Sequence, residues 1–323
     1  MKRLITHNFI GFEEEFSLKH PSTMYILSKL YMRTVGTLND RFNLLNKDSE
    51  YHLLSRNDNI TYITNGKLIP FRECCNKRTN EIIELAKKLN KDIYVSWSGG
   101  VDSTCIVSSF MMNDRLDKKR FHIIHSIEAI AEYPLFYKIL KKEGIHIHNT
   151  NNVIENFKNI VGDNICVNGL CGDQLDGSNL HTMKYSFVDY FDDWKEAVRK
   201  CLPTYNLDRL ISDTEEYAKS FSLDLQFFGE FAWMYNFGIK WTWVAEYMKF
   251  LYNSDYTIPF FDTDYFSHYG LANAHKLKEH KQHKSFLYKT DWKYVIYEYT
   301  KDFIVMEKLE TKSRKLLKIR EEI

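Results

Sequence analysis

The sequence predicts an α/β fold in which a parallel β-sheet carries helices on both faces. From residue 76 onward, short apolar segments with strand character alternate with longer segments of helical periodicity. Such alternation is typical of β–α–β units, whose strands run parallel and whose helices cover the sheet. The chain has 323 residues, 44% of them apolar and 15% aromatic, so it is also long and apolar enough to bury a large core.

The elements of this alternating region follow one another from residue 80 to residue 167. In chain order they are a helix at 80–89, a strand at 93–97, a helix at 103–112, a strand at 121–127, a helix at 133–142, a strand at 145–149, a helix at 153–161 and a strand at 164–167. After about residue 185 the apolar spacing is helical only, at 192–202, 207–221, 225–235 and 241–252 and on to the C-terminus. We therefore expect no strand beyond residue 185.

The segment before the alternating region, residues 1–75, is predicted to be a small N-terminal module. Residues 60–64 alternate with strand period, Asn65-Gly66 is a favoured two-residue turn, and residues 67–69 return, so a hairpin is expected. Residues 24–35 have helical spacing. The predicted organisation is this module, an α/β domain at 76–185 and a helical part at 186–323.

Charge and cysteine content narrow the class of protein. The formal charge is +1, from 44 basic and 43 acidic residues, which disfavours a dedicated nucleic-acid-binding protein. The six cysteines form no C-x-x-C pair, which argues against a zinc ribbon or a thioredoxin-like site. The N-terminus lacks the apolar region of a signal peptide, and no apolar stretch is long enough to cross a membrane. We expect a reduced, cytoplasmic protein.

A loop of small residues follows the first strand of the alternating region. It reads S-G-G-V-D-S from Ser98 to Ser103 and holds the only adjacent glycines of the chain, Gly99 and Gly100. Ligands of open parallel sheets bind where strands end and helices begin. Glycines let backbone N–H groups approach an anion, and the following helix and the two serines add donors. Asp102 would repel a phosphate unless it holds a bridging Mg²⁺, so the loop predicts a metal–polyphosphate site.

This loop differs from other phosphate-binding loops, since no G-K-[ST] follows and the G-x-G-x-x-G spacing is absent. The alternative is an ordinary turn in which Asp102 caps the helix. The loop resembles the PP-loop of the N-type ATP pyrophosphatase superfamily, whose members cleave ATP to AMP and pyrophosphate and transiently adenylate a substrate oxygen. The resemblance implies an adenine nucleotide alpha hydrolase-like fold, with ATP and Mg²⁺ bound at residues 98–103.

A second loop, N-G-L-C-G-D-Q-L-D-G at 168–177, follows the fourth predicted strand. It resembles the S-G-E-G-x-D-E-x-F-G-G loop of the synthetase domain of asparagine synthetases, in which Gly169, Asp173 and Gly177 keep their places. By this resemblance Gly169 helps to bind the nucleotide. Asp173 would be the second carboxylate on Mg²⁺, opposite Asp102.

Two further segments carry weaker resemblances to the same family. I-P-F-F-D at 258–262 resembles its R-x-P-F-L-D segment, and F-I-V-M-E-K at 303–308 resembles the stretch with its catalytic lysine. Lys308 is therefore the predicted catalytic lysine, acting with Asp102, and Lys312 and Lys315 compete for the role. The alternative for Lys308 is a solvated lysine on a charged helix.

The resemblance spans roughly residues 76–315 and implies an ATP-dependent, AMP-forming ligase that makes a carbon–nitrogen bond. The α/β domain would bind ATP, the helical part would complete the site, and ammonia or an amine would attack an activated carboxylate. Leu170 stands where the family has a glutamate, Gln174 replaces the next acid, and Thr257 lies where the family has an arginine. The substrate is therefore expected to differ from aspartate. The family's glutaminase half needs a cysteine at position 2, which here is Lys2, so a separate glutaminase partner is an open alternative.

Two other function classes stay open. One is a PP-loop enzyme that modifies a nucleobase or tRNA, bound through a basic face at 276–289 or 308–320. The neutral net charge disfavours nucleic acid as the partner. The other is a nucleotide-binding protein that kept the fold and lost the chemistry, which Leu170 and Gln174 motivate.

Histidines and aromatic residues elsewhere have both structural and functional interpretations. His122 and His125 straddle one predicted strand, and His146 and His148 share one face of another. Core or sheet-surface positions are favoured over a metal cluster, which would need all these faces to converge. The aromatic run at 227–243 is interpreted as helical core, with a flat pocket for an aromatic substrate as the alternative.

Overall fold

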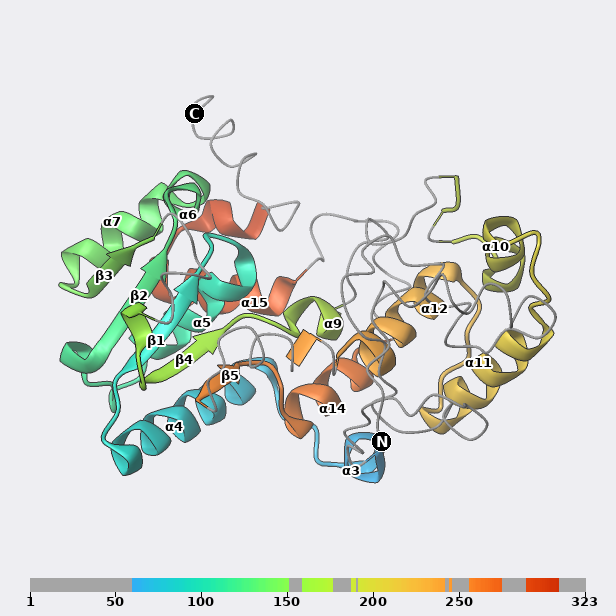
Figure 1. Cartoon of the computed structure of the whole chain (residues 1–323), viewed down its shortest axis with the longest axis horizontal. Coiled ribbons are helices and arrows are strands. Elements are labelled where there is room, and N and C mark those ends of the chain that lie inside the picture. The colour runs from blue at the N-terminus through green and yellow to red at the C-terminus, as the bar shows by residue number, and fades with distance from the viewer. Residues whose placement is uncertain are drawn as a thin grey trace. The chain divides into compact units, whose positions relative to one another are not determined.

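The protein contains a five-stranded sheet whose strands all run parallel (Figure 1). The strands are β1 (Ile93–Trp97), β2 (Phe121–His125), β3 (His146–Asn149), β4 (Ile165–Asn168) and β5 (Thr257–Pro259). Their order is β3-β2-β1-β4-β5, so the chain leaves β1 on one side to form β2 and β3 and returns on the other side to form β4. The predicted α/β class with a parallel sheet is confirmed.

The computed structural model describes residues 60–150, 159–176, 187–189, 191–241, 244–245, 256–274 and 289–307. The chain divides into two compact units. The sheet unit comprises Lys67–Gly172, Met248–Tyr269 and Gln282–Ile323, and the helical unit comprises Met1–Gly66, Asp173–Tyr247 and Gly270–Lys281. Because each unit is built from three segments, the chain passes between them repeatedly.

Helices of the sheet unit flank the sheet. Those of the sheet unit are α4 (Phe71–Leu89), α5 (Val101–Met111), η3 (Lys118–Arg120), α6 (Ile127–Glu132), α7 (Pro134–Lys142), α15 (Thr290–Thr300) and η7 (Phe303–Glu307). On one face α5 packs on β1, and α4 and α15 pack on α5. Trp97 of β1 contacts Phe136 of α7 on this face, with ring centroids 5.5 Å apart. On the other face Val161, at the end of a helical turn, packs on Tyr94, Ile124 and Cys166.

Local sequence explains where several helices begin and end. α4 ends at Asn90, whose left-handed backbone (φ 51°) is one that asparagine tolerates. α7 begins at Pro134, where the missing N–H has no helical partner to lose. α5 begins directly after Gly100, within the small-residue loop.

The helical unit buries an aromatic core. Its elements are α3 (Ile60–Asn65), α10 (Trp194–Cys201), α11 (Asp208–Ser220), α12 (Phe228–Tyr235) and the π-helix η5 (Asn236–Lys240), while α9 (Gly172–Asp176) and α14 (Asp264–Ala272) have residues in both units. Trp194 of α10 stacks on Phe231 of α12 at 5.4 Å, and Trp233 stacks on Phe237 at 4.9 Å. These four rings are buried, so the helical-core interpretation of the aromatic run is confirmed for its members Phe231, Trp233 and Phe237.

Two predictions about secondary structure are wrong, and the strand predicted at 121–127 is too long, since β2 ends at His125 and α6 begins at Ile127. Residues 60–65 form the helix α3 instead of the first strand of a hairpin. Ile63 is fully buried within this helix, whereas five alternating residues carry little strand information. The second error is β5, a strand beyond residue 185. It has only three residues and ends in Pro259, so its sequence has too short a pattern to predict a strand. Because β5 is the last strand in the sheet order, it tolerates a proline.

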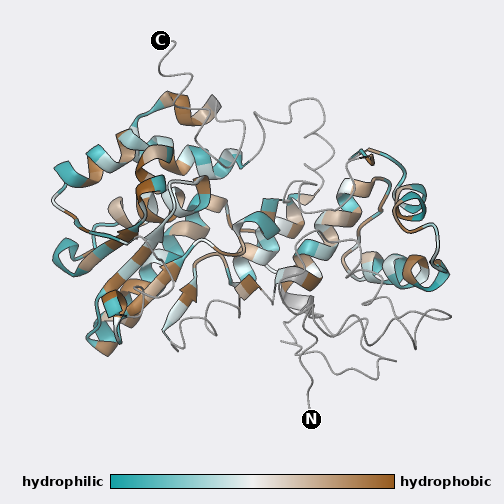
Figure 2. Ribbon diagram, turned by 45° about the horizontal axis from the view of Figure 1, so that its top comes forward, coloured by the Kyte–Doolittle hydropathy of each residue, from teal (hydrophilic) through white to brown (hydrophobic). Residues whose placement is uncertain are grey.

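Hydrophilic and hydrophobic residues are interspersed along the described helices (Figure 2). Among these helices, none combines the length and the hydropathy needed to cross a bilayer. The predicted helix at 24–35 and most of the predicted helices at 153–161 and 241–252 lie outside the described residues.

Candidate functional site

The loop at residues 98–100 connects the central strand β1 to α5, and Gly99 is the residue that shapes it. Gly99 has a left-handed backbone, with φ +79°. A Cβ atom at this position would lie 2.6 Å from both the Ala129 carbonyl oxygen and the Glu132 Cβ atom of α6. Only glycine satisfies both the backbone conformation and the close approach of α6.

The two serines of the loop bond to each other and brace it. Ser103 Oγ lies 3.0 Å from Ser98 Oγ and accepts a hydrogen bond from the Ser98 N–H at 3.1 Å. The Gly100 N–H donates to Ser98 Oγ at 3.3 Å. Ser98 is exposed, whereas Ser103 is buried. Ser98 is thus placed to meet a ligand, and Ser103 supports the loop from below.

The start of α5 is not capped by a side chain, which bears on the alternative interpretation of the loop. Gly100 is the N-cap residue, and Asp102 lies inside the first turn. Capping by Asp102, as in an ordinary strand–helix turn, is therefore not what the structure has. The helix runs for 11 residues, so its N-terminal N–H groups and dipole are directed at the loop.

Asp102 makes an ion pair that sequence reasoning missed. Its Oδ2 atom lies 2.5 Å from the Nζ atom of Lys289, the residue before α15. The Lys289 side chain is fully buried, and that of Asp102 is 20% exposed. In the sequence, Lys289 only ends the basic segment 276–289, and no local pattern links it to a loop 187 positions earlier.

Glycines of the second loop leave room for the Asp102 side chain. A Cβ atom on Gly169 would lie 3.1 Å from the Asp102 Cβ atom and 3.3 Å from the Ser103 nitrogen. A Cβ atom on Gly172 would overlap the Asp102 carboxylate. The structure thus brings Gly169 against the first loop, next to Asp102 and Ser103.

Space and donors around Asp102 fit a Mg²⁺ ion shared with a polyphosphate. Magnesium is usually held by one or two carboxylates together with phosphate oxygens and water, and does not need a full cage of protein ligands. The described residues contain no group of three or more His, Cys, Asp or Glu that could hold a metal ion by itself. Asp102 would supply one carboxylate oxygen, and the absence of side chains at Gly169 and Gly172 makes room for that carboxylate.

The other predicted site residues are placed less fully. Asp173 is the second residue of α9 and is half-buried, and its role as a second metal ligand stays a prediction. Gly177, Lys308, Lys312 and Lys315 lie outside the described residues.

The segment that leads to Lys308 is anchored beside the first loop. Asp302, directly before η7, accepts a hydrogen bond of 2.9 Å from the hydroxyl of Tyr133, and both side chains are buried. Tyr133 follows Glu132, the residue whose Cβ atom approaches Gly99. The first loop and the segment that precedes Lys308 therefore both contact the junction between α6 and α7.

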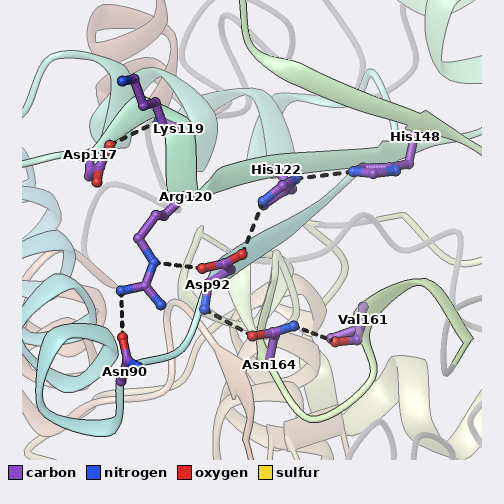
Figure 3. Close-up of polar contacts among 9 residues, drawn as sticks. All are labelled: Asn90, Asp92, Asp117, Lys119, Arg120, His122, His148, Val161 and Asn164. Atoms are coloured by element: carbon purple, nitrogen blue, oxygen red, sulfur yellow. Dashed lines mark hydrogen bonds and ion pairs between the residues drawn. The ribbon is translucent and has the colours of Figure 1, made fainter.

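A second polar cluster lies on one sheet face, around His122 (Figure 3). His122 Nδ1 lies 3.1 Å from His148 Nε2, and His122 Nε2 lies 3.4 Å from an Asp92 oxygen. The His146 ring stacks on the His122 ring at 5.0 Å. Burial, and in second place the neighbouring histidine, lowers the pKa of both His122 and His148. His125 is buried, and its ring contacts Trp97 on the opposite face.

Four of the six cysteines are poor nucleophiles because of their burial. All six are free and buried. Burial raises the pKa of Cys74 to about 12 and that of Cys201 to about 11, and it also raises the pKa of Cys105 and Cys166. These four groups are thiols at neutral pH, and a thiol is a poor nucleophile.

Comparison of the sequence with known proteins does not assign the chain to a family. No protein-family model matches the chain, and no curated protein matches it in sequence.

Proposed function

We propose that the chain is an ATP-dependent ligase that cleaves ATP to AMP and pyrophosphate in order to activate a carboxylate for attack by ammonia or an amine. The observation that carries the proposal is the loop at 98–103, with Gly99 in a left-handed conformation and Asp102 paired to the buried Lys289. A glycine loop, a helix N-terminus, a carboxylate and a buried cation together suit a metal–polyphosphate site.

The position of the loop in the sheet supports the same function. β1 has β2 on one side and β4 on the other, and the chain reverses its direction of travel between them. Ligands of open parallel sheets bind outside the carboxyl ends of strands at such a switch point. Both loops, 98–100 after β1 and 169–172 after β4, leave the sheet there.

Each residue then has a role in the proposed reaction. Backbone N–H groups of residues 99–103 and the Ser98 hydroxyl bind phosphate oxygens, and Asp102, with Asp173 as the second predicted ligand, holds Mg²⁺. The metal supplies positive charge to the departing pyrophosphate. Lys289 adds a second positive charge at the loop, and Lys308 would stabilise the phosphorus centre under attack or the later tetrahedral carbon.

The substrate side of the site is where this chain differs from the asparagine synthetase pattern. Leu170 replaces an acid, so the side chain in this position is apolar. The Leu170 N–H donates a hydrogen bond to the Asn168 side chain at 3.1 Å. Thr257, where the family has an arginine, is buried in β5. We propose a substrate other than aspartate, with ammonia, an amine of the substrate or a separate glutaminase as the nitrogen source.

Release of AMP and pyrophosphate from Mg²⁺–ATP, over a panel of carboxylic acids and amines, tests this function. With the correct acid, Asp102→Ala lowers pyrophosphate release by at least about 100-fold, because the metal loses its ligand at the loop. Asp114→Ala, an exposed aspartate between α5 and η3, serves as the matched control and keeps full activity. Retained turnover in Asp102→Ala contradicts the assignment, and ATP binding without AMP release from any acid supports the nucleotide-binding alternative.

A further inference from the structure

The Asp102–Lys289 pair places a positive charge where the proposed function needs a metal ion. Lys289 Nζ lies 2.5 Å from Asp102 Oδ2, and the lysine side chain has no exposed surface. α15, which starts at the next residue, packs along α5, which carries Asp102, so both backbones are fixed relative to each other. The pair is therefore built into the fold.

A buried ammonium group and a divalent cation compete for the same carboxylate. An ammonium without a counter-charge is costly in a buried position, so Lys289 holds Asp102 when no ligand is bound. A Mg²⁺ ion bonds carboxylate oxygens at about 2.1 Å and would meet the ammonium at close range on the same carboxylate. Metal alone is opposed by this repulsion.

A polyphosphate changes this balance, because it offers Lys289 another anion. We infer that Lys289 controls metal entry at this site: it occupies Asp102 in the free protein and transfers to a phosphate oxygen when ATP binds, so that Asp102 becomes free to bind Mg²⁺. The inference rests on the proposed ATP site at 98–103. Its consequence is a positive coupling between metal and nucleotide, in which each binds weakly alone and each strengthens the other by the same factor.

Metal binding in the absence of nucleotide is the direct readout. Mn²⁺ stands in for Mg²⁺ and is titrated into the full-length protein, with free Mn²⁺ followed by electron paramagnetic resonance. Lys289→Met removes the competing cation, and we expect it to tighten Mn²⁺ binding by about tenfold, within the usual range of such couplings. Mn²⁺ should also raise the melting temperature of this variant more than that of the wild type.

Lys301→Met is the matched control. Lys301 also has a left-handed backbone (φ 56°, against 48° for Lys289) and lies at the opposite end of α15, but it is exposed. Its replacement leaves Mn²⁺ affinity unchanged. If Lys289→Met does not fold, Lys289→Gln, which is neutral and keeps a hydrogen-bonding group, provides the same measurement.

The result that overturns the inference is an unchanged or weaker Mn²⁺ affinity in the Lys289 variant. A second titration separates this failure from failure of the proposed function. It uses an ATP analogue with a methylene group between the α- and β-phosphates, in the presence of Mg²⁺. If the analogue binds the wild type while Mn²⁺ affinity is unchanged in Lys289→Met, the exchange is wrong and the ATP site stands. If the analogue does not bind, the ATP site is wrong and the exchange falls with it.

Discussion

Gly99 and Gly144 have nearly the same backbone conformation but different surroundings. Their φ angles are +79° and +72°, both in the left-handed region. An added Cβ atom at Gly144 meets nothing within 4 Å, whereas at Gly99 it meets Ala129 and Glu132. This pair separates two reasons for a glycine: the backbone conformation, which both share, and the close packing of α6, which only Gly99 has.

Replacing each glycine by alanine should therefore give different losses of stability. Gly144→Ala costs about 1 kcal/mol, the strain of a left-handed alanine. Gly99→Ala costs that amount plus the displacement of α6, so we expect a total of about 3 kcal/mol or more. Free energies of unfolding from urea titrations of both variants measure the difference. Equal losses would mean that α6 yields without cost and that Gly99 is needed only for its backbone conformation.

At the scale of elements, the edge strand β3 is joined to β2 by a cluster of histidines. His122 bonds His148 across the two strands, and Asp92, which precedes β1, lies close to His122 and pairs with Arg120 at 2.6 Å. Tyr94 of β1 stacks on His122 at 4.4 Å. The Asp92 carboxylate favours protonation of His122, while burial and His148 oppose it more strongly.

This cluster makes stability depend on pH in a defined direction. The pKa values of His122 and His148 are lowered in the folded protein, so below about pH 6.5, the ordinary histidine pKa, the unfolded chain binds more protons. The free energy of unfolding therefore falls as pH decreases through 6.5, levels off below the folded pKa values, and receives no contribution from these groups well above pH 7.

The measurement compares urea unfolding at pH 7.5 and pH 5.5. His148→Asn removes one titrating group and reduces the fall in stability between these pH values, relative to the wild type. A fall of the same size in His148→Asn would contradict the role of the histidine pair.

Elements with a strong periodic pattern were predictable from sequence, and short or irregular ones were not. The strands β1, β3 and β4 and the helix α7 lie within a residue or two of the predicted segments, because each is bounded by turn residues. α3 and β5 were not predicted, since segments of six and three residues take their conformation from their neighbours.

At the scale of the whole molecule, the candidate site has one part that the sequence predicts, the loop at 98–103, and one part that it does not, Lys289. The loop at 98–103 is visible in the sequence because one continuous segment carries its chemistry. Lys289 is invisible there, because it meets Asp102 only after α15 has packed on α5. Pairing between distant segments is a property of the tertiary fold, and a single sequence holds no local signal for it.

Ligand binding at this site should stabilise the whole fold by an amount set by mass action. A ligand that binds only the folded protein adds RT ln(1 + [L]/Kd), about 2.7 kcal/mol when its concentration is 100 times the Kd. The α,β-methylene analogue of ATP with Mg²⁺ should therefore raise the melting temperature of the wild type in a concentration-dependent way. Asp102→Ala should lose most of this shift, because metal and nucleotide bind together, while Asp114→Ala should keep it. An equal shift in Asp102→Ala would contradict the role of Asp102 in binding the metal–nucleotide ligand.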